Sequence, residues 1–515
     1  MNPATAAAPR SSAEADYDEV PYPSYPERLT HPDNLATIGG ILGIDTPAVE
    51  TCRVLELGCA SGGNIVPMAF GLPEAEFVGI DISSRQIAEA QRQADALGLE
   101  NLRLIHGSFA DIDAELGVFD YIVSHGVLSW VPAEVREFVY AVSKQNLAPN
   151  GIAYISYNTY PGWHMPNMLR EMMQYHTADF EKPGEKIEQA RALLDFLAAA
   201  TDGADDAFSR LVRSEREMVA TTPDNYFYHD HLEETNSALY FHQFVEACGR
   251  HGLQYVSDAQ IARIWLNNFP PEIAKVLQQF GDAIETEQYM DFVLNRRFRH
   301  SLVCHADAPL NRVVNPDAVE RYAITAKLES GNLAANLFND QAVEVRFPGG
   351  AEVTISGPAT KVALHLLGAA HPRALGYEAL VDGIVNCARD AGETLAEVMA
   401  EPTPAVRNAL AKDLLQLYFG GVIRLHRAVP AVATGVGERP LASPLARLQA
   451  ADQDWVVNQW HVRTLLTPTR RAILRQLDGG KTRAGIEAAA GKTLAIDEPI
   501  EDALEALAGF GLLVG

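Results

Sequence analysis

The sequence predicts an α/β fold, in which a parallel sheet carries helices on both faces and smaller α+β units follow. Short apolar runs alternate with helical segments from residue 53 onward, and a glycine-rich turn joins the first run to a helix. Hydrophobic residues make up 47% of the 515-residue chain and charged residues 21%, which excludes a largely disordered protein. A chain of this length has room for about three domains.

The apolar runs predict five strands in the first part of the chain. They are Val54–Leu57, Phe77–Ile80, Leu102–Ile105, Tyr121–Ser124 and Ile152–Tyr157. Between them, Ser84–Leu97 and Ala133–Asn146 have helical spacing, and Ser83 or Ser84 is suited to cap the first of these helices. Because unbroken apolar strands are buried on both faces, this alternation indicates a parallel sheet between two layers of helices.

Changes in composition divide the chain into six segments. We expect a disordered tail over 1–16, a cofactor-binding core with an N-terminal strap over 17–164, a helical insertion over 165–310, an α+β domain over 311–428, a linker over 429–444 and a winged-helix-like domain over 445–515. The insertion contains a helix, about Tyr240–His251, and the strand-like Leu253–Val256, which is able to add a late strand to the same sheet. Val343–Phe347 and Glu352–Ile355 predict a hairpin, and Phe419–Leu425 a closing strand.

Charge and cysteine usage exclude several classes of partner and compartment. Lys and Arg number 41 against 67 Asp and Glu, so the formal net charge is −26, and we do not expect nucleic acid as a partner. No run of about 18 apolar residues occurs, so no membrane insertion is expected. The five cysteines show no C-x-x-C pair, which favours a reducing compartment and predicts a cytoplasmic location.

The most informative stretch is V-L-E-L-G-C-A-S-G-G-N, residues 54–64. Glycine permits a tight turn, and the helix start behind it offers free N–H groups to a carboxylate or phosphate. Glu56 lies at the end of the first strand, and Asp81 ends the second in V-G-I-D-I-S, where a carboxylate can accept two hydrogen bonds from ribose hydroxyls. A pyrophosphate suits Glu56 poorly because like charges repel, so S-adenosyl-L-methionine is favoured over NAD, FAD or a purely structural turn.

The run E-L-G-C-A-S-G resembles the first motif, E-x-G-x-G-x-G, of class I methyltransferases, with Ala60 in place of the middle glycine. Ala60 is compatible with this turn if its φ is negative. The resemblance implies a Rossmann-like sheet in the order 3-2-1-4-5-7-6 with the seventh strand antiparallel. It also implies ten residues at the cofactor: Glu56, Gly58, Ala60 and Gly62 in the turn, Asp81 and Ile82 at the ribose, Ser108 and Phe109 beside adenine, and Ser124 and His125 on the methionine side.

A second resemblance covers most of the chain. The runs H-G-V-L-S-W-V-P (125–132), S-Y-N-T-Y-P-G-W (156–163), Y-F-H-Q-F-V-E-A (240–247), N-N-F-P-P-E (267–272) and N-R-R-F-R (295–299) are similar to those of bacterial methyltransferases with a methyltransferase regulatory domain. That group includes the rickettsial-type lysine methyltransferases of outer membrane protein B. It implies that 165–310 contains the regulatory domain and that the chain methylates a protein, with lysine as acceptor. A small-molecule acceptor and a non-catalytic protein that binds S-adenosylmethionine are the alternatives.

Transfer to an amine requires the two partners to be aligned and water to be excluded. The ends of the fourth and fifth strands supply groups able to position an acceptor: Trp130, Tyr157, Asn158 and Tyr160. Alternatively, Trp130 and the nearby Trp163 simply pack a helix on the sheet. Tyr22, Tyr25 and His31 could cover the cofactor as a flap or pack as a surface strap.

Three further clusters suggest structural roles. The stretch H-D-H-L-E-E (229–234), with His242 nearby, is interpreted as an acidic helix start, and no metal is expected. Arg296, Arg297 and Arg299 follow Glu285, Glu287 and Asp291, which predicts internal ion pairs. Arg470, Arg471 and Arg475 lie in a nearly neutral segment, which favours core support or protein recognition over reading of DNA.

Overall fold

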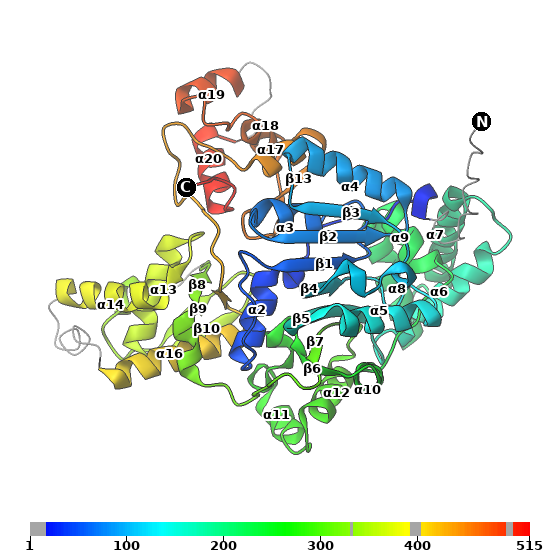
Figure 1. Ribbon diagram of the computed structural model, residues 1–515, viewed down its shortest axis with the longest axis horizontal. Helices are drawn as coiled ribbons and strands as arrows, with labels where there is room; N and C mark the ends of the chain where they lie inside the picture. The colour runs from blue at the N-terminus through cyan, green and yellow to red at the C-terminus, as the bar shows by residue number, and fades with distance from the viewer. Residues whose placement is uncertain (1–16, 330–332, 392–402, 491–497) are drawn as a thin grey trace.

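The computed structural model describes residues 17–329, 333–391, 403–490 and 498–515. A seven-stranded sheet in the order β3-β2-β1-β4-β5-β7-β6 forms its centre (Figure 1). The strands are β1 (Arg53–Leu57), β2 (Glu76–Asp81), β3 (Leu102–His106), β4 (Phe119–Ser124), β5 (Leu147–Asn158), β6 (Leu253–Asp258) and β7 (Phe298–His305). The strands β1 to β5 are parallel, and β7 is antiparallel to β5 and to β6. The predicted fold class, strand order and late strand are therefore confirmed.

Helices cover both faces of this sheet. One face packs against α2 (Pro32–Ile41), α3 (Ile65–Gly71) and α4 (Ser84–Leu97), and the other against α5 (Ala133–Gln145) and α10 (Phe241–Arg250). The helix α4 has the predicted bounds because Ser83 caps its start by accepting a hydrogen bond from the Gln86 N–H, and Gly98 ends it in a left-handed conformation. The parallel strand ends thus open toward one edge, where ligands bind in such sheets.

The resemblance implied a seventh, antiparallel strand, but the apolar runs did not locate β7 because its sequence begins F-R-H. Arg299 points into the core all the same, with its guanidinium bound to Asp291 at 2.8 and 3.0 Å and to Glu287 at 2.9 Å. Arg296 Nε lies 2.6 Å from Asp291 Oδ1. Both acids come from α12 (Ala283–Leu294), so the predicted internal ion pairing is confirmed for Arg296 and Arg299, while Arg297 is exposed. The ion pairs of Arg299 allow a charged strand to be buried.

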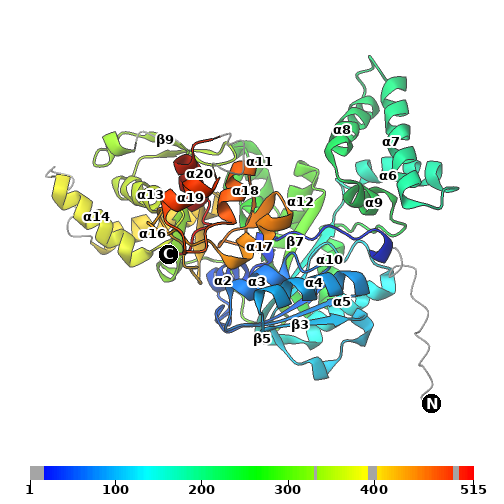
Figure 2. The same cartoon turned by 90° about the horizontal axis from the view of Figure 1, so that it is seen from above.

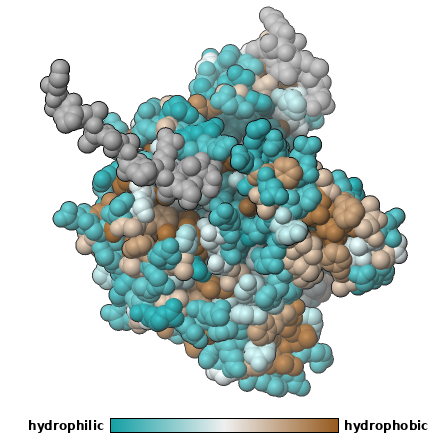
Figure 3. All heavy atoms as spheres, turned by 90° about the vertical axis from the view of Figure 1, so that its right-hand side faces the viewer, coloured by the Kyte–Doolittle hydropathy of each residue, from teal (hydrophilic) through white to brown (hydrophobic). Residues whose placement is uncertain are grey.

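Four helices form a separate unit with its own core. They are α6 (His164–Thr177), α7 (Pro183–Ala200), α8 (Ala207–Thr221) and α9 (Asp224–Leu232). Figure 2 shows them rising together from one side of the sheet. Figure 3 shows the molecule from the right-hand side of Figure 1, where these helices lie. Hydrophilic residues cover much of this face, and hydrophobic residues gather in separate patches. Farther along the chain, α11 (Pro271–Leu277) directly precedes α12.

A second α+β unit follows β7. Its elements are β8 (Ala323–Ala326), the hairpin β9 (Val343–Arg346) and β10 (Glu352–Ile355), α13 (Pro358–Ala370), β11 (Leu375–Gly376), α14 (Tyr377–Ala391), α16 (Pro404–Phe419) and β12 (Ile423–His426). The hairpin is confirmed. The predicted strand Phe419–Leu425 is wrong at its start, because α16 continues to Phe419 and the Gly420–Gly421 turn precedes β12.

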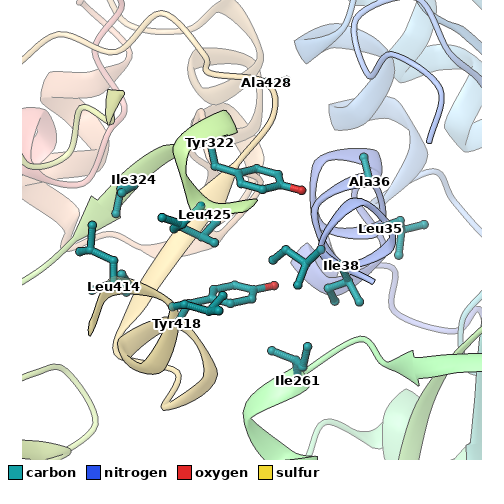
Figure 4. Packing of buried hydrophobic residues seen from close by; sticks show 14 of the residues in the cluster. Leu35, Ala36, Ile38, Ile261, Tyr322, Ile324, Leu414, Tyr418, Leu425 and Ala428 are labelled. Carbon is teal, nitrogen blue, oxygen red and sulfur yellow. The ribbon is translucent and has the colours of Figure 1, made fainter. Parts of the chain in front are cut away.

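The core of this unit is continuous with that of the sheet domain. Figure 4 shows Leu35 and Ile38 of α2 beside Tyr322, Tyr418 and other apolar residues of the second unit. The helix α2 is buried on both sides and joins the two domains.

The C-terminal unit has a third core. It contains α17 (Pro444–Asp452), β13 (Trp455–Val457), β14 (Arg463–Leu465), α18 (Pro468–Leu474), α19 (Arg483–Ala490) and α20 (Ile500–Gly509). Leu441 and Ala442, which the sequence placed in a linker, form bridges to Asp478 and Leu513. Across the described ranges, no helix combines the length and the apolar character needed to span a bilayer.

Candidate active site

The glycine turn between β1 and α3 lies at the carboxyl edge of the sheet. Gly58 and Gly62 have φ values of +78° and +79°, which only glycine adopts freely. Ala60 has a φ of +47°, so the expected negative φ is wrong. The Ala60 N–H donates to Asp81 Oδ2 at 2.9 Å, and this charged hydrogen bond offsets part of the conformational cost.

Asp81 is buried at the end of β2. Its other oxygen, Oδ1, accepts from the Ser83 N–H at 2.9 Å. Burial raises the pKa of Asp81, and these backbone hydrogen bonds act in the opposite direction. Each carboxylate oxygen keeps a second acceptor site, which is the requirement for holding two ribose hydroxyls. Ile82 follows directly, with its carbonyl 3.0 Å from His106 Nε2.

Glu56 is the second buried carboxylate of the turn. Its Oε1 accepts from Asn64 Nδ2 at 2.7 Å, while its Oε2 has no hydrogen-bond partner in the described part of the chain. Burial raises the pKa of Glu56 to about 7, the bond from Asn64 opposes this rise, and Asp81 adds to it. A buried carboxylate oxygen without a partner fits the amino group of S-adenosylmethionine and would repel a pyrophosphate.

Asn64 connects this site to two distant parts of the chain, and the sequence analysis did not single it out. Its Oδ1 accepts from the Glu27 N–H at 2.9 Å and lies 2.8 Å from His461 Nε2 in the C-terminal unit. Its Nδ2 also donates to Thr30 Oγ1 at 2.9 Å. His461 is buried with a φ of +55°, a strained conformation that this contact helps to hold. No local sequence signal marks such a long-range contact.

The N-terminal strap, residues 17–31, crosses the turn. The Gly63 N–H donates to Ser24 Oγ at 2.8 Å, and a Cβ at Gly63 would collide with the Ser24 carbonyl. This glycine is therefore required by the strap and not by a ligand. The strap ends in a short 3₁₀ helix, η1 (Arg28–Thr30).

The three strap residues proposed as a flap make other contacts. Tyr22 packs against Tyr226 and His229 of α9. Tyr25 packs edge-on against Trp455, and His31 lies against His461, both in the C-terminal unit. These side chains thus fasten the strap at both ends, and Ser24 between them is the residue that reaches the turn.

Two pairs of neighbouring residues that were predicted to contact the cofactor, Ser108–Phe109 and Ser124–His125, lie on opposite sides of the turn. Ser108 caps the short 3₁₀ helix η2 (Phe109–Asp111) by accepting from the Ala110 N–H, and the Phe109 ring lies beside Gly58. At the end of β4, Ser124 is buried and its hydroxyl has no partner in the described part of the chain. His125 Nδ1 lies 2.8 Å from the Tyr154 hydroxyl, and burial lowers the pKa of His125 to about 4. The imidazole is therefore neutral near pH 7.

The four residues predicted to position an acceptor are not equivalent. Tyr157 does not fit the predicted role in positioning the acceptor. Its ring is buried against Phe244 at 4.4 Å, and its hydroxyl contacts Ser301 at 3.1 Å, inside the core beneath α10. Side chains alternate along a strand, which turns Tyr157 toward that core. The next residue, Asn158, is also buried, and its amide donates to Asn236 at 3.4 Å.

The other two lie farther out at the strand ends. The Tyr160 ring stacks on His164 at 4.0 Å and approaches Tyr240 at 5.3 Å. Trp130 meets Trp163 edge to face at 6.3 Å, so the packing role that was kept as an alternative is observed for this pair. An aromatic surface nevertheless remains where an apolar side chain could lie.

The remaining clusters are engaged in internal contacts. The predicted helix start over 229–234 is wrong, because residues 229–232 form the last turn of α9. His229 pairs with Glu233 and His231 with Glu215, while His242 contacts Gln288. In the described ranges, no group of three or more His, Cys, Asp or Glu side chains is arranged to hold a metal ion. Arg470 binds Glu498, and Arg471 donates to the carbonyls of Ala450 and Ala451, which supports the core of the C-terminal unit.

Comparison with known proteins gives the family. Residues 48–201 match the family model of a methyltransferase domain, 223–305 that of a predicted methyltransferase regulatory domain, and 438–506 that of the PKMT C-terminal winged helix domain. Protein RP028 of Rickettsia prowazekii is 40% identical over 230 residues, which is 45% of this chain and 92% of the relative. PKMT2 from Rickettsia typhi, solved in complex with AdoHcy, superposes with a TM-score of 0.84 at 29% identity, covering 96% of this chain and 100% of the other.

The chain belongs to the class I S-adenosylmethionine-dependent methyltransferases. Within them it shares the regulatory and winged helix domains of the group that the sequence indicated. Protein RP789 of Rickettsia prowazekii is 46% identical over 308 residues, and the match covers 60% of this methyltransferase and 56% of RP789. The chain thus spans little more than half the length of that relative. The cofactor of the family, S-adenosylmethionine, agrees with the unpartnered Glu56 Oε2 and the free acceptor sites of Asp81.

Proposed function

We propose that this chain transfers the methyl group of S-adenosylmethionine to the side-chain amine of a lysine in a protein. The observation that supports a protein acceptor most directly is the likeness to PKMT2, which extends over 96% of the chain and includes the winged helix domain. Enzymes that share only the sheet domain act on many kinds of acceptor, so the sheet domain alone favours none of them.

The cofactor supplies an electrophilic methyl group on a sulfonium. The acceptor nitrogen forms a new N–C bond as the S–C bond breaks, and the sulfur leaves with the bonding pair as a neutral thioether. The amine must first lose a proton to solvent, because an ammonium has no lone pair to attack with. Alignment and exclusion of water are the main tasks left to the protein.

The chain's own residues divide this work. Glu56 accepts from the amino group and Asp81 from the ribose hydroxyls, with Ile82 also at the ribose. Ser108 and Phe109 lie beside the adenine, and the main chain of Gly58, Ala60 and Gly62 forms the floor of the site. Ser124 and His125 lie at the end of β4, where the methionine portion would extend. The neutral His125 imidazole, held by the Tyr154 hydroxyl, puts no positive charge beside the sulfonium.

The acceptor side is assigned to the aromatic strand ends. Trp130 and Tyr160 offer an apolar wall that favours the neutral form of a lysine amine, because burial lowers the pKa of an ammonium. Asn158 remains a candidate for orienting the nitrogen through its amide oxygen. Tyr157 is not proposed for this role.

We further propose a cytoplasmic location and a role for the two C-terminal units in holding an extended polypeptide. All five cysteines are free, which fits a reducing compartment. The C-terminal unit contacts the strap through Tyr25 and His31, so it is placed next to the turn.

The test is transfer of a labelled methyl group to a cell lysate. The purified chain is incubated with methyl-labelled S-adenosylmethionine and lysate, and protein is separated from small molecules and hydrolysed. We expect label in methylated lysine. Asp81→Ala should lose transfer and bind the cofactor at least tenfold more weakly, since hydrogen bonds to a charged group contribute about 1.5–3 kcal/mol. Asp95→Ala, on the exposed side of α4, is the matched control.

Each other outcome contradicts a defined part of the proposal. Label in the small-molecule fraction alone would replace the protein acceptor by a metabolite. Label in another amino acid would replace lysine. Binding without transfer to any fraction would indicate a non-catalytic protein that binds S-adenosylmethionine.

A further inference from the structure

A cavity of about 660 Å³ lies where three parts of the chain meet. The strap and α3 contribute Arg28 and Phe70, the second α+β unit contributes Lys327 and Arg424, and the C-terminal unit contributes Trp460 and Arg463. Phe70 is near the far end of α3, whose first turn follows the glycine turn. The cavity extends along α3 from Phe70 to His461, which contacts Asn64 at the start of that helix, so it adjoins the cofactor site without including Glu56 or Asp81.

The lining is cationic in a strongly acidic chain. Four Lys and Arg side chains, namely Arg28, Lys327, Arg424 and Arg463, face three carboxylates, namely Asp33, Glu50 and Glu74. The formal charge of the whole chain is −26, so a local excess of positive charge is against the general trend. Glu50 and Glu74 are exposed to solvent, as are Lys327, Arg424 and Arg463, whereas Arg28 is half-buried.

The remaining carboxylate, Asp33, favours the charged form of Arg28, as Glu27 does, but its hydrogen bonds go to other groups. Asp33 Oδ2 lies 2.8 Å from His426 Nδ1, and Asp33 Oδ1 accepts from the N–H groups of Arg427 and Ala428. Within the described ranges, neither Arg28 nor Arg424 has a carboxylate at ion-pair distance or a side-chain hydrogen bond. Two guanidinium groups, ten donors in all, thus line one cavity without partners.

The two neighbouring guanidinium groups repel each other, and an anion between them would relieve this repulsion. Arg424 is exposed along the cavity, but the protein groups packed around it lower its pKa to about 9, and the positive charge of Arg28 adds to the effect. Burial also lowers the pKa of Arg28. The nearby His31 and His461 are neutral, because burial lowers both of their pKa values. A bound anion would remove the repulsion and satisfy the donors at once.

We propose that this cavity binds a small polyanion, whose phosphate or carboxylate groups lie between Arg28 and Arg424. Both side chains present the planar fork that matches such groups. A volume of 660 Å³ is within the range of about 300–1,000 Å³ that holds small organic ligands, so more than a single inorganic ion fits. Trp460 and Phe510 supply apolar surface for the rest of the molecule.

The position of Arg28 gives such a ligand a route to the cofactor site. Arg28 belongs to η1, and its neighbours Glu27 and Thr30 both bind Asn64, which in turn holds Glu56. The proposal for the cavity does not depend on the methyl acceptor, because it concerns binding alone.

The test is calorimetric titration of the full chain with pyrophosphate and, separately, with citrate at constant ionic strength. We expect saturable binding of at least one probe at one site per chain. Pyrophosphate alone would assign phosphorylated ligands, and citrate alone would assign polycarboxylates. Arg28→Gln and Arg424→Gln should each weaken binding at least tenfold, and Arg424→Lys should weaken it less. Arg103→Gln, on the distant edge strand β3, should have no effect.

Two results would overturn the inference. One is the absence of saturable heat with both probes. The other is binding that both glutamine variants retain at the wild-type affinity, which would indicate a different site. Thermal unfolding without any anion separates these outcomes from misfolding: Arg424→Gln should not lower the unfolding midpoint, because it removes the repulsion from Arg28.

Discussion

At the scale of single residues, the site depends on two buried carboxylates in different surroundings. Asp81 accepts two backbone hydrogen bonds, so its charge is partly compensated before any ligand arrives. Glu56 has one hydrogen bond, from Asn64, and a free second oxygen. Burial raises its pKa to about 7, so Glu56 titrates near neutral pH.

This difference predicts that cofactor affinity depends on pH through Glu56. A ligand amino group binds the ionised carboxylate, so affinity should rise about tenfold between pH 6 and pH 7.5, as expected for a group with a pKa near 7. Glu56→Gln keeps the contact with Asn64 and removes the charge, and should therefore bind more weakly and without this rise. Calorimetric titration with S-adenosylhomocysteine at several pH values measures both effects.

Glu56 also makes the stability of the fold depend on pH, but stability should fall as pH rises, whereas cofactor affinity should increase. The folded pKa lies above the ordinary value of about 4.5, so the folded state binds the proton more tightly than the unfolded state does. The contribution of Glu56 to stability is present below pH 4.5 and is lost as pH rises to about 7. Relative to the wild type, Glu56→Gln should therefore be more stable at pH 8 than at pH 5. An equal difference at both values would contradict the raised pKa.

At the scale of elements, the strap is the feature that most affects the turn. It is a segment with little regular structure, held by Tyr22 at α9, by Ser24 at Gly63 and by Tyr25 at Trp455. An irregular segment of this kind stays in place only through side-chain contacts, and it can open without unfolding the sheet. The strap is thus placed to control access to the turn.

Gly63→Ala should displace the strap. The new Cβ would collide with the Ser24 carbonyl, so the hydrogen bond to Ser24 Oγ should be lost, and the first residues of the strap should open. Hydrogen exchange over residues 17–31 should become faster, with a smaller change in the sheet. Gly71→Ala, at the other end of α3, meets no heavy atom within 4 Å and is the matched control. Equal exchange in the two variants would show that the strap is not held at Gly63.

At the scale of the whole molecule, the domains differ in how strongly they depend on one another. The core of the second α+β unit merges with that of the sheet domain through α2, where Leu35 and Ile38 are fully buried. The C-terminal unit has its own core and contacts the rest through small sets of residues such as Tyr25–Trp455 and Asn64–His461. A merged core cannot be divided without exposing apolar surface.

Two truncations test this difference. A chain that ends after residue 310 should aggregate, because it exposes the outer side of α2. A chain that ends after Pro430 should remain soluble and unfold cooperatively, with a lower midpoint from the loss of the contact between Asn64 and His461. Size-exclusion chromatography and thermal unfolding measure both. A soluble, monomeric 1–310 fragment would contradict the merged core, and it would make the sheet domain an independent unit.

The sequence by itself determined the sheet, the turn and its two acids. Apolar runs, helical spacing and glycines are local signals, and β1 to β5, α4 and the positions of Glu56 and Asp81 could be predicted from them. The resemblance added the strand order and supported the cofactor that Glu56 and the turn already favoured. The predicted roles of the turn residues also depend on local order, since a strand end, a turn and a helix start are neighbours in the chain.

Only the tertiary structure decided what lies against these elements. It buried Arg299 in a strand through acids on α12, turned Tyr157 into the core, and set Ala60 at a positive φ beside Asp81. It also brought Ser24 and His461, one from each end of the chain, to the turn and to Asn64 at the start of α3, and placed Arg28 and Arg424 around one cavity. These contacts join residues up to about 400 positions apart, and no local pattern encodes them because their energy arises only when the separate cores have packed together.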